Sequence, residues 1–223
     1  MNGDLPACIL FDLDGTLVDS LPGIEFSVRE AFSVCRLPLP RESLREMIGP
    51  PIRTILSRAG NVVEESSLDA LEHAFRTSYD SDGWCKSECF PGANRVLRVM
   101  HERGHRLFVV SNKPRQISLQ ILKREGVLEC FEAIVTRDSR LPNYHGKEEM
   151  IRTLLAERII GKKCFMVGDT AEDANAAASA GIEFIWMMHG YGTAVEMASI
   201  PIAHALDSFS QFLPLMMKEP VCD

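Results

Sequence analysis

The sequence contains no uncharged apolar run of about 20 residues, the length that a membrane-spanning helix requires. Its first residues also lack a secretory signal, which would be a basic region followed by a long apolar core. We therefore expect no membrane association and, by default, a cytoplasmic location. An excess of positive charge is missing too, because the net charge is -7 and the pI is about 5.4. This acidity argues against nonspecific binding of nucleic acid.

Paired cysteine and histidine motifs are also missing. The seven cysteines are scattered and odd in number, and only Cys85 and Cys89 lie close together. No second Cys/His pair stands at the spacing of a structural zinc site. We expect reduced, mostly structural thiols rather than a zinc centre.

What the chain does contain is typical of a globular protein. Its 223 residues are enough for a sizeable core, and 46% of them are hydrophobic. Short apolar runs occur at residues 7–11, 107–111, 133–136, 164–168 and 183–188. Helical patterns lie between the later runs, at 114–125, 147–158 and 171–180. This alternation predicts a parallel α/β sheet.

The segment between the first two apolar runs is much longer than a direct crossover needs, because about 95 residues separate Phe11 from Leu107. Apolar residues within it recur at helical spacing. We predict a main domain made of residues 1–19 and 87–223, with a small helical domain inserted at residues 20–86.

Acidic residues follow two of the predicted strands. Asp12 and Asp14 come directly after the first strand, and Asp169 and Asp173 follow the strand at 164–168. Capping and turn formation explain single acids at such places but not four at one sheet edge. Two unit charges about 4 Å apart repel by roughly 4 kcal/mol at an effective dielectric of 20. A bound divalent cation would offset this repulsion, and oxygen ligands without His or Cys favour Mg²⁺.

Ser111 and Asn112 end the second predicted strand, and Pro114 follows as the first residue of a predicted helix. A hydroxyl, an amide and free backbone N–H groups at a helix N-terminus can bind phosphate. The signal is weak by itself, because the same residues cap helices that bind nothing.

A lysine in the following part of the chain could add positive charge to such a site. Lys147, in "YHGKEEMI", is the best candidate, and Lys162 and Lys163 compete with it. The alternative for Lys147 is an ordinary solvated lysine at the start of a helix.

Taken together, "DLDGT", "SN", a later lysine and "GDTAED" resemble the four ordered motifs of the haloacid dehalogenase superfamily. The inserted helices look like the cap of that superfamily. The stretches "IGPP", "GYG" and "ALDSFSQF" are similar to its phosphoglycolate phosphatase-like branch. That branch usually carries its lysine in a Lys-Pro-x-Pro setting, which is absent here. The resemblance implies a three-layer α/β/α Rossmann-like core with a parallel sheet and a helical cap.

The resemblance also implies roles for individual residues. Asp12 would be the nucleophile, Asp14 the acid and base, and Lys147 the cation beside them. The remaining roles are Mg²⁺ binding by Asp12, the Asp14 backbone, Asp169 and Asp173, and substrate or phosphate binding by Thr16, Ser111, Asn112 and Arg53. For Arg53, an ordinary surface arginine is at least as good an interpretation.

The predicted function is Mg²⁺-dependent hydrolysis of a small phosphorylated metabolite, a phosphoglycolate-like phosphomonoester, through an aspartyl-phosphate. Dehalogenation is disfavoured because Asp14 is present, and phosphonate cleavage because no lysine precedes Lys86. A phosphosugar mutase, a nucleotidase and a non-catalytic phospholigand-binding protein remain as alternatives. The substrate and the oligomeric state stay open.

Overall fold

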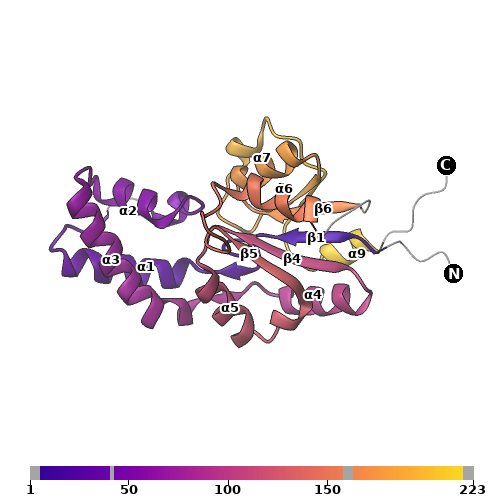
Figure 1. Cartoon of the computed structure of the whole chain (residues 1–223), viewed down its shortest axis with the longest axis horizontal. Helices are drawn as coiled ribbons and strands as arrows, with labels where there is room; N and C mark the ends of the chain where they lie inside the picture. Colours follow the sequence, from indigo (N-terminus) through magenta and orange to yellow (C-terminus); the bar gives the residue numbers. More distant parts are fainter. Residues whose placement is uncertain (1–5, 41–42, 158–162, 218–223) are drawn as a thin grey trace.

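The computed structural model describes residues 6–40, 43–157 and 163–217. A parallel six-stranded sheet lies at its centre, with the order β5-β4-β1-β6-β7-β8 (Figure 1). The strands span Phe131–Thr136 (β5), Arg106–Ser111 (β4), Cys8–Phe11 (β1), Cys164–Gly168 (β6), Glu183–Met187 (β7) and His204–Leu206 (β8). The predicted parallel α/β sheet is confirmed.

Helices cover both faces of this sheet. Figure 1 shows α4 and α5 on one face and α6 and α7 on the other, which makes the three layers that the sequence predicted. These helices span Ala93–Glu102 (α4), Arg115–Arg124 (α5), Lys147–Glu157 (α6) and Ala171–Ala180 (α7). Shorter elements complete the main part of the chain, at Leu128–Cys130 (η3), Ala194–Met197 (α8) and Phe212–Met216 (α9).

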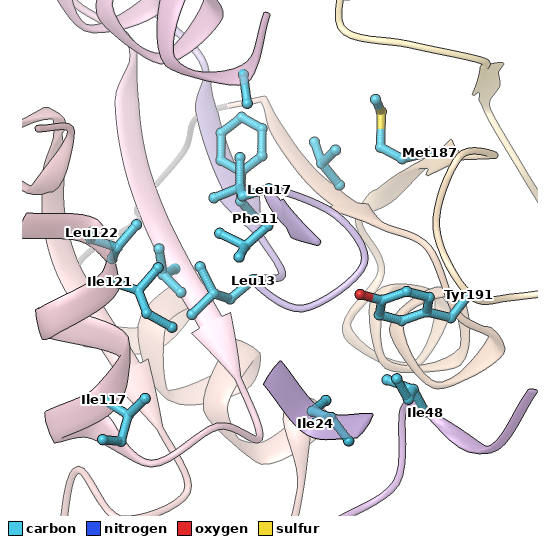
Figure 2. Packing of buried hydrophobic residues seen from close by; sticks show 14 of the residues in the cluster. Phe11, Leu13, Leu17, Ile24, Ile48, Ile117, Ile121, Leu122, Met187 and Tyr191 are labelled. Atoms are coloured by element: carbon cyan, nitrogen blue, oxygen red, sulfur yellow. The ribbon is translucent and has the colours of Figure 1, made fainter. Parts of the chain in front are cut away.

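The first strand shows why its sequence is apolar throughout. Ile9 and Phe11 belong to the hydrophobic cluster that contains residues of α4 and α5, whereas Cys8 and Leu10 belong to the cluster that contains residues of α6 and α7. Figure 2 shows Phe11 in the first cluster, with Ile121 of α5. A strand covered on both faces needs apolar residues at every position. Full burial of a side chain such as Phe11 contributes roughly 1.5–3 kcal/mol.

The polar residues of interest begin where β1 ends. The backbone N–H of Asp12 donates to the carbonyl of Val167 at 2.9 Å, so β1 and β6 are still aligned at this point. From β1 the chain reaches β4 on one side of it and later reaches β6 on the other side. The carboxyl edge of a sheet at such a reversal of strand order is a common ligand site.

Residues 20–86, which we call the helical segment, leave and rejoin the sheet domain through a short antiparallel pair. β2 (Val18–Asp19) pairs with β3 (Glu88–Cys89), so the two ends of the segment lie side by side. Figure 1 shows its helices beyond one end of the sheet. They span Leu21–Val34 (α1), Leu44–Met47 (η1), Ile52–Gly60 (α2), Glu65–Ser81 (α3) and Gly83–Lys86 (η2). The fold does not test whether this segment is a separate domain, so that division stays a prediction.

The sequence lacks paired cysteine motifs and long apolar runs, and the structure bears on both points for the described residues only. Their six cysteines form no disulfide, and Cys222 lies outside the described residues. None of the helices in this part of the chain combines the length and apolar character needed to cross a membrane.

Close packing of two glycines joins α1 to η2. A Cβ built at Gly23 would lie 2.2 Å from the backbone oxygen of Gly83. Helix propensity alone predicts that Gly23→Ala stabilises the protein by about 0.5–1 kcal/mol. We expect the opposite, a loss of about 1–3 kcal/mol in the free energy of unfolding, because backbone must move to admit the methyl group. Urea denaturation measures this change.

Ser33→Ala is the matched control, since Ser33 is an exposed residue of the same helix. This substitution should leave stability unchanged or raise it slightly, in line with helix propensity. A Gly23→Ala protein as stable as Ser33→Ala would contradict the packing explanation.

Candidate active site

A cavity of about 510 Å³ lies between the carboxyl edge of the sheet and the helical segment. Most of the residues singled out from the sequence line it, namely Asp12, Asp14, Arg53, Ser111, Asn112 and Lys147. Thr16, Asp169 and Asp173 lie behind this wall, where they contact one another or the lining residues. The structure thus brings the four sequence motifs together.

Three buried carboxylates form the centre of the site. One oxygen each from Asp12, Asp169 and Asp173 lies within 4.8 Å of the others. The Lys147 ammonium lies 2.9 Å from Asp12 Oδ2 and 2.6 Å from Asp173 Oδ1, and its side chain is only 3% exposed. Burial lowers the pKa of Lys147, but Asp12 and Asp173 more than reverse this and hold the pKa well above its ordinary value. Lys147 therefore stays charged and offsets part of the carboxylate charge.

Neighbouring hydrogen bonds fix the orientation of these carboxylates. The Thr16 hydroxyl donates to Asp169 Oδ1 at 2.9 Å, and the backbone N–H of Tyr191 donates to Asp169 Oδ2 at 2.7 Å. The hydroxyl and backbone N–H of Thr170 donate to Asp173 Oδ2 in a capping box. Asp173 therefore caps α7 with one oxygen and holds Lys147 with the other.

The glycine of "DLDGT" is required by the closeness of Asp169. Gly15 has a φ of +83°, and a Cβ at this position would lie 2.2 Å from Asp169 Oδ2. Both the turn and the contact therefore exclude a larger residue.

Burial and mutual repulsion shift the acids toward their neutral forms. Burial, together with the charge of Asp173, raises the pKa of Asp169 to about 7, although the hydrogen bonds from Tyr191 and Thr16 oppose this. The pKa of Asp12 is also raised well above its ordinary value, mainly by burial, although Lys147 opposes this. An additional cation would stabilise the ionised forms of these carboxylates, whose pKa values are raised.

The residues present fit a divalent metal ion. Asp12 Oδ1 is buried and has no hydrogen-bond partner among the described residues, while Asp169 and Asp173 supply further oxygens close by. Mg²⁺ prefers such all-oxygen sites. The four carboxylates of the site, those of Asp12, Asp14, Asp169 and Asp173, carry a formal charge of -4, and Lys147 and Lys113 supply +2. A divalent cation would balance the remaining charge of -2.

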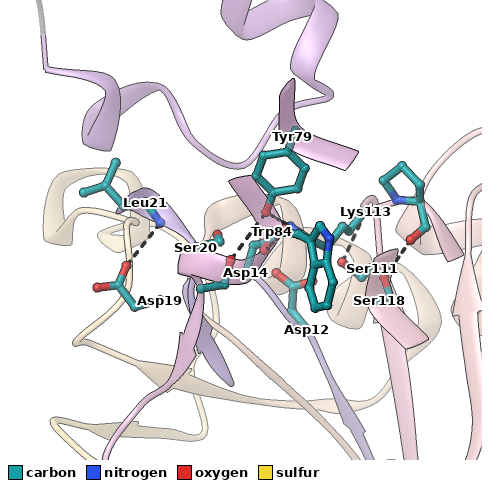
Figure 3. Close-up of polar contacts among 12 residues, drawn as sticks. Asp12, Asp14, Asp19, Ser20, Leu21, Tyr79, Trp84, Ser111, Lys113 and Ser118 are labelled. Carbon is teal, nitrogen blue, oxygen red and sulfur yellow. Dashed lines mark hydrogen bonds and ion pairs between the residues drawn. The ribbon is translucent and has the colours of Figure 1, made fainter. Parts of the chain in front are cut away.

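Lys113 is a site residue that the sequence analysis missed. Its ammonium donates to Asp14 Oδ1 at 2.8 Å and to the Tyr79 hydroxyl at 2.7 Å, and its side chain is 4% exposed (Figure 3). Burial lowers its pKa, but Asp14 and Tyr79 outweigh this and raise it. Lys113 therefore connects Asp14 of the sheet domain with α3 of the helical segment. A signal was available, because Lys113 follows "VVSN" directly at the end of a buried strand.

Ser111 and Asn112 lie at the cavity wall, and some of their polar groups already have hydrogen-bond partners. The Asn112 side-chain amide donates to both oxygens of Glu172, at 2.9 and 3.0 Å. At the start of α5, the N–H of Arg115 donates to the carboxylate of Asp138. The Ser111 side chain is buried and accepts from the N–H of Lys113. The predicted phosphate site therefore has fewer free hydrogen-bond donors than a helix N-terminus whose N–H groups have no partners.

The lysine candidates occupy different places. Lys147 reaches the acids, whereas Lys163 lies just before β6, at the opposite end of that strand from Asp169, and pairs with Glu183 at 3.3 Å. Lys162 lies outside the described residues.

Arg53 lines the cavity, but its guanidinium is held by carboxylates of α3. It lies 2.5 Å from Glu65, 2.7 Å from Asp69 and 3.0 Å from Glu72. Its predicted contact with a substrate anion stays a prediction.

Tyr191, the centre of "GYG", was not predicted as a site residue either. Besides its N–H bond to Asp169, its hydroxyl donates to Asp19 and accepts from the N–H groups of Ser20 and Leu21. Arg45 of the helical segment lies over its ring, 5.4 Å from the centroid. Tyr191 therefore joins the acid cluster to the point where the chain enters the helical segment.

The charged cavity lies at the carboxyl edge of the sheet, where α/β proteins commonly bind ligands at a reversal of strand order. The family model of the haloacid dehalogenase-like hydrolases matches residues 9–187 of the chain. The chain belongs to this family, which confirms the resemblance drawn from its motifs.

Curated relatives cover most of the chain. The tyrosine-protein kinase PtkA of Mycobacterium tuberculosis is 32% identical over 193 residues, which are 86% of this chain and 65% of that relative. The phosphoglycolate phosphatase of Nitrosococcus oceani is 27% identical over 95% of this chain and 96% of its own length. The 5'-nucleotidase of Pseudomonas aeruginosa is 31% identical over 88% of this chain and 89% of its own length.

Solved structures agree on the fold. PtkA of Mycobacterium tuberculosis superposes with a TM-score of 0.81 at 29% identity, covering 97% of this chain and all of that one. A haloacid dehalogenase-like hydrolase of Streptococcus pneumoniae gives a TM-score of 0.84 at 21% identity, covering 95% of this chain and 99% of that one. The second likeness concerns the fold alone.

The raised pKa of Asp169 predicts a pH-dependent stability of the metal-free protein. A carboxyl with a pKa of about 7 in the folded state and 3.8 ordinarily holds its proton more strongly when folded. Its contribution to stability is complete below pH 4 and is lost as the pH rises to about 7, by up to about 4 kcal/mol. Asp169→Asn has no carboxyl group at this position, so its stability does not decrease for this reason as the pH rises. In EDTA, its stability relative to wild type should therefore increase from pH 5 to pH 8.

Urea denaturation at several pH values measures this difference. Asp207→Asn, which removes an exposed carboxylate, controls for the change in net charge. A stability difference between Asp169→Asn and wild type that does not vary with pH would show that burial of Asp169 carries no such cost.

Proposed function

We propose that the protein is a Mg²⁺-dependent phosphatase that hydrolyses a small phosphorylated metabolite through an aspartyl-phosphate. The observation that carries this proposal is the buried cluster of Asp12, Asp169 and Asp173, held by Lys147 beneath a cavity that Asp12 lines. Family membership and the relatives named as phosphoglycolate phosphatases support it.

In the first half of the proposed reaction, a carboxylate oxygen of Asp12 attacks phosphorus and the bond to the leaving alkoxide breaks. Lys147 holds Asp12 Oδ2 in place, and Oδ1 has no partner among the described residues. Asp14 donates its proton to the alkoxide, which leaves as an alcohol. Ser111 and Asn112 would donate hydrogen bonds to phosphoryl oxygens at the cavity wall, and Thr16 would hold Asp169 in position.

In the second half, ionised Asp14 takes a proton from water while the water oxygen attacks phosphorus. The bond to Asp12 breaks, and inorganic phosphate leaves. Asp12, Asp169, Asp173 and the Asp14 backbone carbonyl would hold the metal ion. When bound, Mg²⁺ would neutralise charge on the phosphoryl oxygens and on these carboxylates. Lys113 lies 2.8 Å from Asp14 Oδ1 and would hold this side chain in position during this half.

We further propose that the helical segment, residues 20–86, is a cap that covers the leaving group, while residues 1–19 and 87–223 form the catalytic domain. The cavity is lined by both parts, and the paired β2 and β3 form the connection between them. A cap in this place would exclude water during the first half of the reaction.

Hydrolysis of nucleoside monophosphates is a second candidate, favoured by the 31% identical relative named as a 5'-nucleotidase. Phosphotransfer to another acceptor, as in a mutase or in the relative named as a tyrosine-protein kinase, would use the same Asp12 chemistry. A non-catalytic binding protein would have no need for Asp14 and Lys113 to be positioned together. The oligomeric state stays open, and a cytoplasmic location stays an expectation from the sequence.

A phosphatase assay on p-nitrophenyl phosphate tests the proposal. With Mg²⁺ the wild type should release phosphate, and Asp12→Asn should lower kcat by more than about 10³-fold because the nucleophile is gone. EDTA should abolish the activity, and Asp207→Asn should retain it. Acid-quenched wild type should carry a hydroxylamine-labile phosphate that Asp12→Asn lacks. Equal rates for wild type and Asp12→Asn would refute the proposal.

The place of Lys113 predicts a separate kinetic effect. Lys113→Met should lower kcat by about 10- to 100-fold, part of the effect of acid–base catalysis, because Asp14 loses the group that positions it. KM should change less, and the steady-state fraction of phosphoenzyme should rise. Lys123→Met is the control, since Lys123 is an exposed residue of α5. Thermal denaturation identifies any loss of folded protein, and an unchanged kcat in folded Lys113→Met would contradict the assigned role.

A further inference from the structure

The helical segment contributes an apolar wall to the cavity. Ile48, Ile55, Phe75 and Tyr79 line it, and each is less than a tenth exposed. Phe75 and Tyr79 lie one helical turn apart on α3, with their rings stacked at 5.3 Å between centroids and 12° between planes. An apolar wall of this kind gains stability by covering apolar or aromatic surface of a ligand.

The arginines of the same wall are already paired with carboxylates. Arg53 is held by the carboxylates of Glu65, Asp69 and Glu72, and Arg76 lies 3.5 Å from Glu72. Glu65 and Asp69 pair with Arg53 from outside the cavity lining. Glu72 itself lines the cavity. An anionic group placed against this wall would therefore meet a negative carboxylate and no uncompensated cation.

The two lysines of the cavity are paired with carboxylates as well. Lys113 is held by Asp14, and Lys147 by Asp12 and Asp173. Arg137, in the loop after β5, also lines the cavity, and its guanidinium donates to the carbonyl of Tyr144 at 3.3 Å. A carboxylate that is buried without a partner loses several kcal/mol of hydration free energy.

We propose that the substrate is a phosphomonoester whose leaving group is uncharged and largely apolar or aromatic. This inference rests on the proposed phosphatase function and narrows its substrate class. A volume of about 510 Å³ lies within the roughly 300–1,000 Å³ of typical ligand pockets, so it accommodates a phosphate with a ring-sized leaving group. The two-carbon carboxylate of phosphoglycolate would fill little of this space and would face Glu72.

A matched series of phosphomonoesters tests the inference. Ethyl phosphate and phosphoglycolate differ only in a methyl group against a carboxylate, and 2-phenylethyl phosphate adds a ring. With Mg²⁺ the kcat/KM should increase from phosphoglycolate to ethyl phosphate by about tenfold, because like charges placed together are costly. It should increase again by about tenfold or more with the phenyl ring, as expected when apolar surface enters an apolar pocket.

Variants separate the charge contribution from the apolar one. Glu72→Gln should raise kcat/KM for phosphoglycolate by roughly three- to tenfold, since it removes one contact between like charges. It should change kcat/KM for ethyl phosphate less than for phosphoglycolate. Glu65→Gln is the control, because Glu65 also pairs with Arg53 but is 82% exposed and does not line the cavity. Phe75→Leu should lower kcat/KM for 2-phenylethyl phosphate more than for ethyl phosphate.

The outcomes distinguish this inference from the proposed function. If phosphoglycolate is hydrolysed faster than both other esters, the protein is a phosphatase and the inference about its leaving group is wrong. If p-nitrophenyl phosphate is hydrolysed but none of the three esters is, the inference fails alone. If p-nitrophenyl phosphate is not hydrolysed above the level of Asp12→Asn either, the proposed function fails and the inference fails with it.

Discussion

Repulsion among buried carboxylates is the constraint on which the rest of this structure depends. Asp12, Asp169 and Asp173 come from two neighbouring strands and the helix after one of them, and burial makes each charge expensive. The protein offsets this cost with buried lysines and with donors such as Thr16 and the N–H of Tyr191. Gly15 is small because Asp169 must come close. The turn sequences around the site follow from this requirement.

Much of this arrangement could be predicted from the sequence, for physical reasons. β1 and β6 are buried on both faces, so they stand out as apolar runs, and the acids after them must meet because parallel strands end at one edge. The short strands β2, β3 and β8 could not be predicted, since two or three residues carry no detectable period. Their pairing is decided by contacts distant in sequence.

The missed site residues share a different property. Lys113 and Tyr191 act through partners that lie far away in the chain, Asp14 and Tyr79 for the lysine, and Asp19 and Asp169 for the tyrosine. A motif reports the residue types at one place, but it does not report which distant group will satisfy them. Arg53 illustrates the same limit, because its place in the sequence does not report the three acids of α3 that pair with it.

The short pair of β2 and β3 has a consequence for how the chain folds. Cys8 and Arg106 must pair to join β1 with β4, although the whole helical segment separates them in sequence. Once Val18 lies against Cys89, that segment becomes a closed side loop, and the two strands are joined by a far shorter effective connection. Closing a shorter loop costs less chain entropy. Two residues at each end of the segment thus shorten the conformational search for the centre of the sheet.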